Sequence, residues 1–179
     1  MTTLSSTAWI AHNIGLAASI GGTLFGQQAL RPALEERLGD EQERMLVADA
    51  AWRKFGWVNL AAHGLFAATW FVGRKMLSGY EVSPRARKMT LVKDGLIVAS
   101  LVTGIASTII GRILGKKTRQ LEMRSSVEDQ PSVDRLRKVV TGVGLVNLLS
   151  TASVIAVTTS LAMEGNRSLP FSIFSRRLP

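Results

Sequence analysis

Residues 95–114 read GLIVASLVTGIASTIIGRIL, a stretch of twenty positions in which Arg112 is the single charged side chain. A helix needs about 20 predominantly apolar residues to cross the ~30 Å of hydrocarbon in a bilayer. Three further stretches have the same character, at residues 8–30, 55–73 and 139–163. The sequence therefore predicts an all-α integral membrane protein with four spans, folded as an up-down four-helix bundle.

The four spans and their links use nearly all of the 179 residues. We therefore expect a single four-span membrane domain over residues 1–179, without a separate soluble catalytic domain. Residues 1–7 contain no Lys or Arg, so we expect the first apolar run to be a retained span and not a signal peptide. The chain has no Cys, which excludes thiol–disulfide chemistry, iron–sulfur clusters and a thiolate nucleophile.

The net charge of +9 comes from basic residues that, apart from Arg112, lie outside the spans. In membrane proteins such residues gather at helix ends, where they meet anionic lipid headgroups, so we expect no nucleic-acid partner. Two basic runs stand out, and we predict that they contact anionic lipid or the acidic face of a neighbouring subunit. A solvated helix end is the simpler alternative. The runs contain Arg85, Arg87 and Lys88, and Lys116, Lys117 and Arg119.

Capping residues predict where the helices begin. Asp40 with Glu43 three positions later predicts a helix that starts outside the bilayer and continues to residue 73. Ser83, followed by proline, predicts the next start, and Ser132 the last. Pro32 predicts the end of the first span, because proline disfavours helix at the residue before it. Helices two to four are therefore expected to extend beyond the bilayer.

Loop charges predict the orientation. The first and third loops carry thirteen Lys and Arg, against nine in the N-terminus, second loop and tail together. Because cytoplasmic loops carry the excess of basic residues, we expect both termini on the non-cytoplasmic side. The expected location is a bacterial cytoplasmic membrane.

Small residues recur at three- and four-residue steps inside the spans. Close backbone approach through small residues holds helices together in lipid. Internal packing is the expected role, and contact with a helix of another protein is the alternative. The set consists of Gly15, Ser19, Gly22, Gly26, Ser100, Gly104, Ser107, Gly111 and Gly142.

Uncharged polar residues also lie inside the spans. At 1.5 Å per residue, Asn59 and Asn147 fall within ~3 Å of one level, Gln27 lies about a turn further along, and His63 follows Asn59 by four positions. We predict that they form an interhelical hydrogen-bonded layer, worth ~1 kcal/mol or less per contact. A small-ligand or quinone-headgroup site is the alternative.

The two histidines, His12 and His63, raise the question of haem, because neutral imidazoles are axial ligands. Counting at 1.5 Å per residue places them about 9 Å apart in depth, which fits a bis-histidine haem poorly. Two histidines without a deep carboxylate also fit a di-metal site poorly. We therefore expect no cofactor and no metal.

Nothing in the sequence has the spacing of a catalytic motif. There is no phosphate-binding glycine loop and no Ser-His-Asp set, so we expect no catalytic residue. The charged residues nearest the spans are Lys93 and Asp94 at one end of the third and Arg112 near its other end. Ion-coupled transporters and proton pumps usually need an ionisable group at depth, which argues against both.

The segment GLAASIGGTLF at residues 15–25, followed by ALRPAL at residues 29–34, resembles a known pattern. It is similar to the first helix of small four-span bacterial membrane proteins of the DoxX-like and anthrone-oxygenase-like kind. The resemblance covers about 20 residues of the first span. It implies a compact four-helix bundle, in some members tied to quinone or electron-transfer systems, and carries over no catalytic residue.

These observations favour a non-enzymatic accessory or scaffolding subunit of a larger membrane protein complex, of respiratory or photosynthetic type. A membrane-embedded quinone- or redox-linked enzyme that uses His12, Asn59, His63 and Asn147 is the second hypothesis. A small lipid or solute transporter is the third. The expected partners are larger membrane subunits and anionic lipids, and a homo-oligomer stays open.

Overall fold

The computed structural model describes residues 2–74, 83–124 and 130–165, all helical apart from residues 38–40 and Ser83. The predicted links around residues 75–82 and 125–129, and the tail after residue 165, lie outside the described residues. The elements are α1 (Thr2–Phe25), the π-helical η1 (Gly26–Leu30), α2 (Arg31–Arg37), α3 (Glu41–Arg74), α4 (Pro84–Arg124) and α5 (Gln130–Gly165). The all-α class is confirmed.

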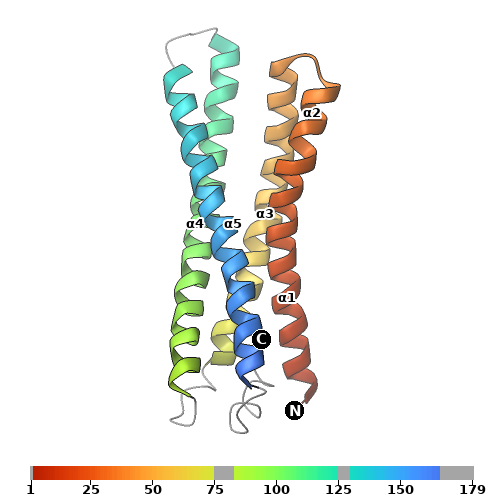
Figure 1. Ribbon diagram of the computed structural model, residues 1–179. Coiled ribbons are helices and arrows are strands. Elements are labelled where there is room, and N and C mark those ends of the chain that lie inside the picture. Colours follow the sequence, from red (N-terminus) through yellow and green to blue (C-terminus); the bar gives the residue numbers. More distant parts are fainter. Residues whose placement is uncertain (1, 75–82, 125–129, 166–179) are drawn as a thin grey trace.

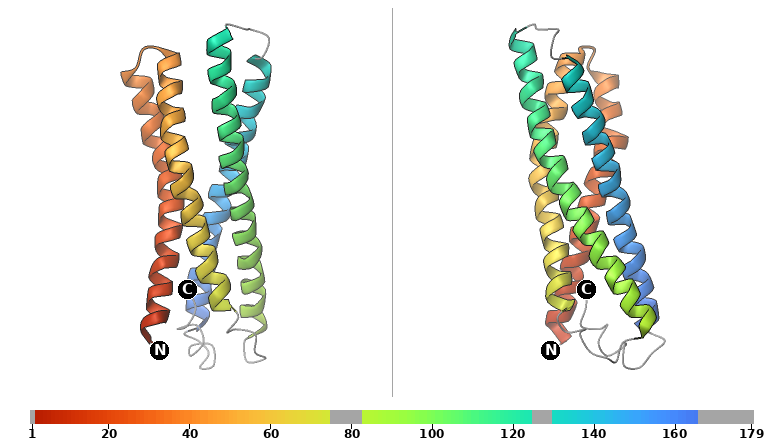
Figure 2. Two further views of the ribbon diagram at one scale, coloured as in Figure 1. Left: turned by 180° about the vertical axis from the view of Figure 1, so that it is seen from behind. Right: turned by 90° about the vertical axis from the view of Figure 1, so that its left-hand side faces the viewer.

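The long helices lie lengthwise beside one another in two closely packed pairs, α1 with α3 and α4 with α5. The pairs meet where α3 contacts α4 and where α1 contacts α5. In Figure 1, and from behind in Figure 2, the pairs draw apart toward the end opposite the N-terminus. The two pairs therefore approach each other most closely in the middle and toward the N-terminal end.

The predicted helix starts at Asp40 and Ser83 are confirmed. The Gln42 backbone N–H donates to Asp40 Oδ1 over 3.0 Å, and the Ala86 N–H donates to Ser83 Oγ over 3.1 Å. Each oxygen satisfies a backbone donor that the first turn of a helix leaves free. The start predicted at Ser132 is wrong, because α5 begins at Gln130 and Ser132 lies inside it.

The predicted helix end at Pro32 is also wrong. The chain stays helical to Arg37, and Leu38 is the first extended residue, with φ −110° and ψ 116°. A proline ring within an α-helix clashes with the carbonyl four residues earlier. The chain widens into η1 just before Pro32, where the Arg31 N–H reaches back five residues to the Gly26 carbonyl. We attribute the continued helix to this π-helical segment, which shifts the carbonyls in front of the ring.

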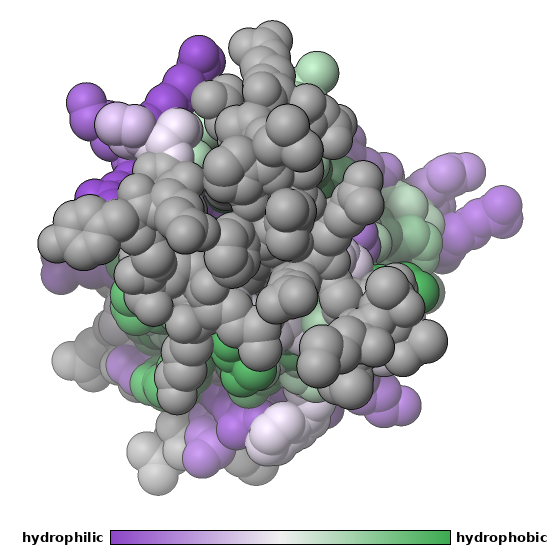
Figure 3. Space-filling view, turned by 90° about the horizontal axis from the view of Figure 1, so that it is seen from below, coloured by the Kyte–Doolittle hydropathy of each residue, from purple (hydrophilic) through white to green (hydrophobic). Residues whose placement is uncertain are grey.

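The bundle has a mixed interior and a largely apolar surface. In the part of the chain that the structure describes, twelve buried side chains are polar or charged and ten are hydrophobic, whereas large apolar side chains such as Val72, Val102 and Leu149 are more than half exposed. Figure 3, viewed from the N-terminal end, shows apolar residues on the flanks of the bundle among hydrophilic ones. Among the described residues, three helices, α3, α4 and α5, are long and apolar enough to cross a membrane.

Glycines bring α1 and α3 into close contact. A Cβ on Gly15 would lie 2.7 Å from the Ala62 backbone oxygen and 3.1 Å from the Phe66 nitrogen. Farther along, added Cβ atoms on Gly22 of α1 and on Gly26, the first residue of η1, would overlap the rings of Phe55 and Trp52. The stripe on α1 therefore sets the distance between these two helices.

Gly15→Ala is expected to lower the free energy of unfolding by about 1–3 kcal/mol, the usual cost of overpacking, because the obstacle is backbone that cannot turn away. Gly21→Ala is the matched control, since nothing lies within 4 Å of its added Cβ. It should be neutral, or stabilising by up to about 1 kcal/mol through helix propensity. Thermal unfolding of both variants in one detergent measures the difference, and equal melting temperatures would contradict the packing assignment.

Candidate functional site

The middle of the bundle contains a hydrogen-bonded group of side chains from all four long helices. We call it the central polar cluster, and every member is buried or half-buried. Its members are Ser19 on α1, Asn59 and His63 on α3, Ser100 and Thr103 on α4, and Asn147 and Thr151 on α5.

His63 lies at the centre of this cluster, and its hydrogen bonds define its tautomer. Its Nδ1 lies 2.7 Å from the Asn59 backbone oxygen, which can only accept, so Nδ1 carries the proton. Nε2 is then the acceptor, and the Asn147 amide nitrogen donates to it over 3.1 Å. His63 therefore connects α3 to α5 as a neutral imidazole.

Asn147 connects three helices through one amide group. Its Nδ2 also lies 2.7 Å from the Ser100 backbone oxygen and 3.0 Å from Thr103 Oγ1, both on α4. An amide carries two N–H donors, so three acceptors use its donor capacity completely. An added Cβ on Gly104 would lie 3.4 Å from the same nitrogen, which shows how closely α4 approaches here.

Hydroxyl groups complete the cluster on both sides. Ser19 Oγ donates to Asn59 Oδ1 over 3.1 Å and joins α1 to α3. Thr151 donates its hydroxyl to the Asn147 backbone oxygen over 2.8 Å. Since that hydroxyl has one proton, Ser100 is the donor in the 2.7 Å contact between Ser100 Oγ and Thr151 Oγ1. The polar groups thus bind one another, as a low-dielectric interior requires.

His12 lies nearer the N-terminal end, separated from His63 by Phe66. The Phe66 ring centroid is 6.1 Å from that of His12 and 5.1 Å from that of His63. His12 Nδ1 donates to the Phe66 backbone oxygen over 2.9 Å, which leaves Nε2 as an acceptor. His12 is fully buried, and within the described part of the chain Nε2 has no hydrogen-bond partner.

Lys93 is the unexpected residue of the interior. The sequence places it at the end of a span, yet its side chain is fully buried, with Nζ 3.7 Å from the Trp70 ring centroid. The neighbouring Asp94 accepts a 2.8 Å hydrogen bond from Trp70 Nε1. An ammonium over an indole face is a favourable cation–π arrangement. One tryptophan therefore binds both charged residues of this Lys-Asp pair.

The residues predicted to form a polar layer separate into two groups. Asn59, His63 and Asn147 belong to the central polar cluster, whereas Gln27 is exposed on η1. The predicted packing residues divide as well. Ser19 and Ser100 belong to the cluster and Gly104 contacts it, Ser107 is half-buried, and Gly111 and Gly142 have nothing within 4 Å of an added Cβ.

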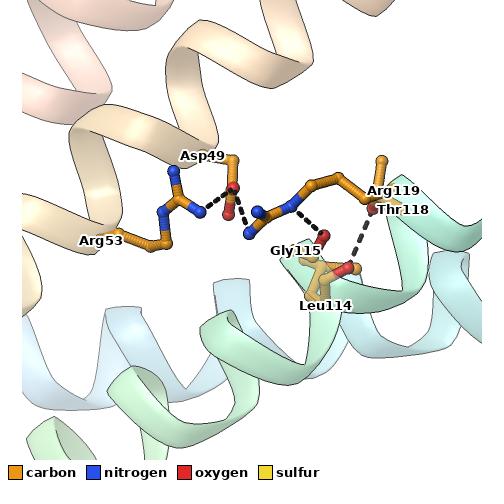
Figure 4. A network of polar contacts seen from close by, with 6 residues as sticks. All are labelled: Asp49, Arg53, Leu114, Gly115, Thr118 and Arg119. Atoms are coloured by element: carbon orange, nitrogen blue, oxygen red, sulfur yellow. Dashed lines mark hydrogen bonds and ion pairs between the residues drawn. The ribbon is translucent and has the colours of Figure 1, made fainter.

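The two predicted basic runs differ in what they contact. Arg85, Arg87, Lys88 and Lys116 are exposed, and Lys117 is half-buried. Arg119 reaches across to α3, where its Nη2 lies 3.3 Å from Asp49 Oδ2 (Figure 4). Arg119 thus takes part in a contact between helices.

Asp49 joins the two helix pairs near the end opposite the N-terminus. Besides Arg119, it pairs with Arg53 on its own helix, at 3.6 Å from Nη1 (Figure 4). Arg119 Nε also donates to the Gly115 backbone oxygen over 3.2 Å. An added Cβ on Gly115 would overlap the Asp49 carboxylate, so the junction depends on a glycine there.

The sequence did not predict Lys93, Thr103, Thr151 and Asp49 as interior or bridging residues. One signal was available, because Asp49, Gly56, His63 and Trp70 recur every seven positions on α3. Positions seven apart share a helix face, and each of these four contacts α4 or lies against it. Which residues of α4 face these four positions depends on the lengthwise position of α4 along α3, and the sequence does not predict that position.

The arrangement favours structural cohesion over catalysis. The central polar cluster supplies neutral donors and acceptors that are mutually engaged. Within the described residues, no group of three or more His, Asp or Glu could hold a metal ion. The buried lone pair of His12 Nε2, which has no partner among the described residues, points to a further hydrogen-bonding group.

Asn147→Leu is expected to lower the free energy of unfolding by about 1–3 kcal/mol, because His63 Nε2 loses its donor while it stays buried. The melting temperature in detergent measures this loss. Thr159→Val is the matched control on the same helix, since its exposed hydroxyl donates to the Ile155 oxygen of its own helix. A fully stable Asn147→Leu protein would count against a cohesive role for the cluster.

Gly115→Ala is expected to separate Asp49 from Arg119 and to widen the distance between α3 and α4 at that end. Spin labels on exposed positions of these helices measure the change in distance. Gly111→Ala, one turn earlier on the same helix, has nothing near its added Cβ and should leave the distance unchanged. The loss in stability should be below about 1 kcal/mol, because the ion pair is partly solvated. An unchanged distance in both variants would show that the junction does not depend on Gly115.

Comparison with protein-family models, with curated proteins and with solved structures finds no match to this chain. What the protein does is therefore inferred from its own side chains.

Proposed function

We propose that this protein is a four-span up-down membrane bundle, with helices two to four extended beyond the bilayer, that serves as a non-enzymatic accessory subunit. In this proposal α1 with η1 supplies the first span, and the larger assembly is a membrane protein complex. The observation that supports this proposal is that the polar groups of the central polar cluster form hydrogen bonds with one another. The amide nitrogen of Asn147, for example, contacts three acceptors. Polar groups that bind one another hold the helices together. The contacts with partner proteins are therefore assigned to the outer surface of the bundle.

The outer surface supports contact with other helices. Gly111 on α4 and Gly142 on α5 have nothing within 4 Å of an added Cβ, and so do Gly64 and Gly95. These glycines lower helix propensity by about 1 kcal/mol each without serving a contact inside the described chain. Small residues let a second helix approach closely in lipid, so a partner helix would give them a role.

The test is purification from the native membrane in a gentle detergent, followed by mass spectrometry of every co-eluting protein. We expect larger membrane subunits in fixed stoichiometry. Gly111→Leu and Gly142→Leu should release them while the chain stays folded. Val102→Leu, at a side chain that is 61% exposed, is the control and should retain them. Elution of the unmodified chain alone would overturn the subunit proposal.

One observation favours a second candidate, a quinone- or redox-linked enzyme of the DoxX-like type. His12 is fully buried and its Nε2 has no partner among the described residues, so it could accept a hydrogen bond from a reduced quinone or ligate an iron. An absorption spectrum of the purified protein, with extraction of bound quinone, separates the candidates. A Soret band or stoichiometric quinone would favour the enzyme.

A further inference from the structure

Arg112 and Trp57 form an exposed pair on the outer side of the contact between α3 and α4. The Arg112 guanidinium carbon lies 4.6 Å from the Trp57 ring centroid. Trp57 is 64% exposed, and Arg112 is exposed as well. In a water-soluble protein a tryptophan side chain is largely buried, whereas at a membrane–water interface it lies among the lipid headgroups.

The side chains around this pair change character along the helices. Toward the end opposite the N-terminus, Lys116 follows Arg112 by one turn and is exposed. In the other direction the neighbours of Arg112 on α4 are apolar, and Ile109 and Ile105 are 53% and 46% exposed. On α3 the corresponding neighbour is Gly64, which has open space around it. The order along the bundle is therefore cation, indole, then apolar surface.

The charged residues at the end opposite the N-terminus favour an anionic ligand beside α4. In the sequence, residues 112–140 contain eight Lys and Arg and four acids. Residues 31–54, on the other helix pair, contain five Lys and Arg and six acids. An anionic ligand is thus attracted toward α4 and α5 and not toward the whole end equally.

We propose that Arg112, Trp57 and Lys116 form a binding site for one anionic phospholipid. The phosphate binds between the guanidinium and ammonium groups, the indole lies at the level of the glycerol, and an acyl chain follows Ile109, Ile105 and Gly64. An acidic protein segment would match the two cations but not the apolar surface that continues from them. This site is independent of the accessory role.

The experiment is native mass spectrometry of delipidated protein titrated with phosphatidylglycerol and, separately, with phosphatidylcholine. We expect one tightly bound phosphatidylglycerol and no comparable site for phosphatidylcholine. Arg112→Gln should weaken phosphatidylglycerol binding about fivefold, the value of one basic residue at an anionic interface. Trp57→Leu should weaken it as well, and Arg112→Lys should retain part of the affinity.

Lys138→Gln is the matched control, because it removes one positive charge from an exposed position on α5 at the same end. It should change the affinity less than twofold. An equal loss for Lys138→Gln and Arg112→Gln would overturn the site in favour of general charge attraction. Equal binding of both lipids, or no loss in either Arg112→Gln or Trp57→Leu, would also overturn it. Circular dichroism establishes that each variant is folded.

Discussion

The side-chain amide of Asn147 is the interaction on which the middle of the bundle depends. It brings α5 within hydrogen-bonding distance of α4 and of the His63 imidazole on α3. His63 can accept that bond because its own Nδ1 proton is directed to the Asn59 carbonyl. The two contacts thus require each other, and exchanging either residue for an apolar one leaves a buried group without its partner. Where water is excluded such a group is costly, so the polar interior specifies which helix faces meet.

The contacts around α1 and those around α4 differ in kind. Where α1 and the start of η1 lie against α3, the small residues from Gly15 to Gly26 let aromatic rings and backbone pack directly, so contact area supplies the cohesion. Around α4, buried apolar side chains such as Ile97, and Val154 of α5, also belong to the hydrophobic core, and hydroxyl and amide groups add hydrogen bonds, as in the contact between Ser100 and Thr151. In hydrocarbon there is little hydrophobic drive between helices, and these are the two means that remain. The cluster around His63 is where they combine, because α1 joins it through Ser19.

Local signals in the sequence predicted two of the four helix boundaries, those at Asp40 and Ser83, and failed at Ser132 and Pro32. The caps at Asp40 and Ser83 begin α3 and α4 as expected, because each cap bond joins residues only two or three positions apart. Counting residues also placed Asn59 and Asn147 near one level, and both belong to the central polar cluster. The π-helical segment before Pro32 was not predictable, because proline alone signals a helix end. The burial of Lys93 was also beyond reach, since it depends on how α4 is positioned along α3 beside Trp70.

The strengths of these contacts differ along the bundle, and this difference has a consequence for motion. Near the middle several buried hydrogen bonds act together, each worth about 1 kcal/mol in a membrane interior. At the far end the junction of Asp49 with Arg53 and Arg119 is partly exposed, and such pairs contribute less than about 1 kcal/mol. The ribbons are also farther apart there (Figure 2). Separation of the two helix pairs at that end therefore costs less free energy than separation at the cluster. A partner or lipid that binds beside Arg112 acts at the end of the bundle that resists displacement least.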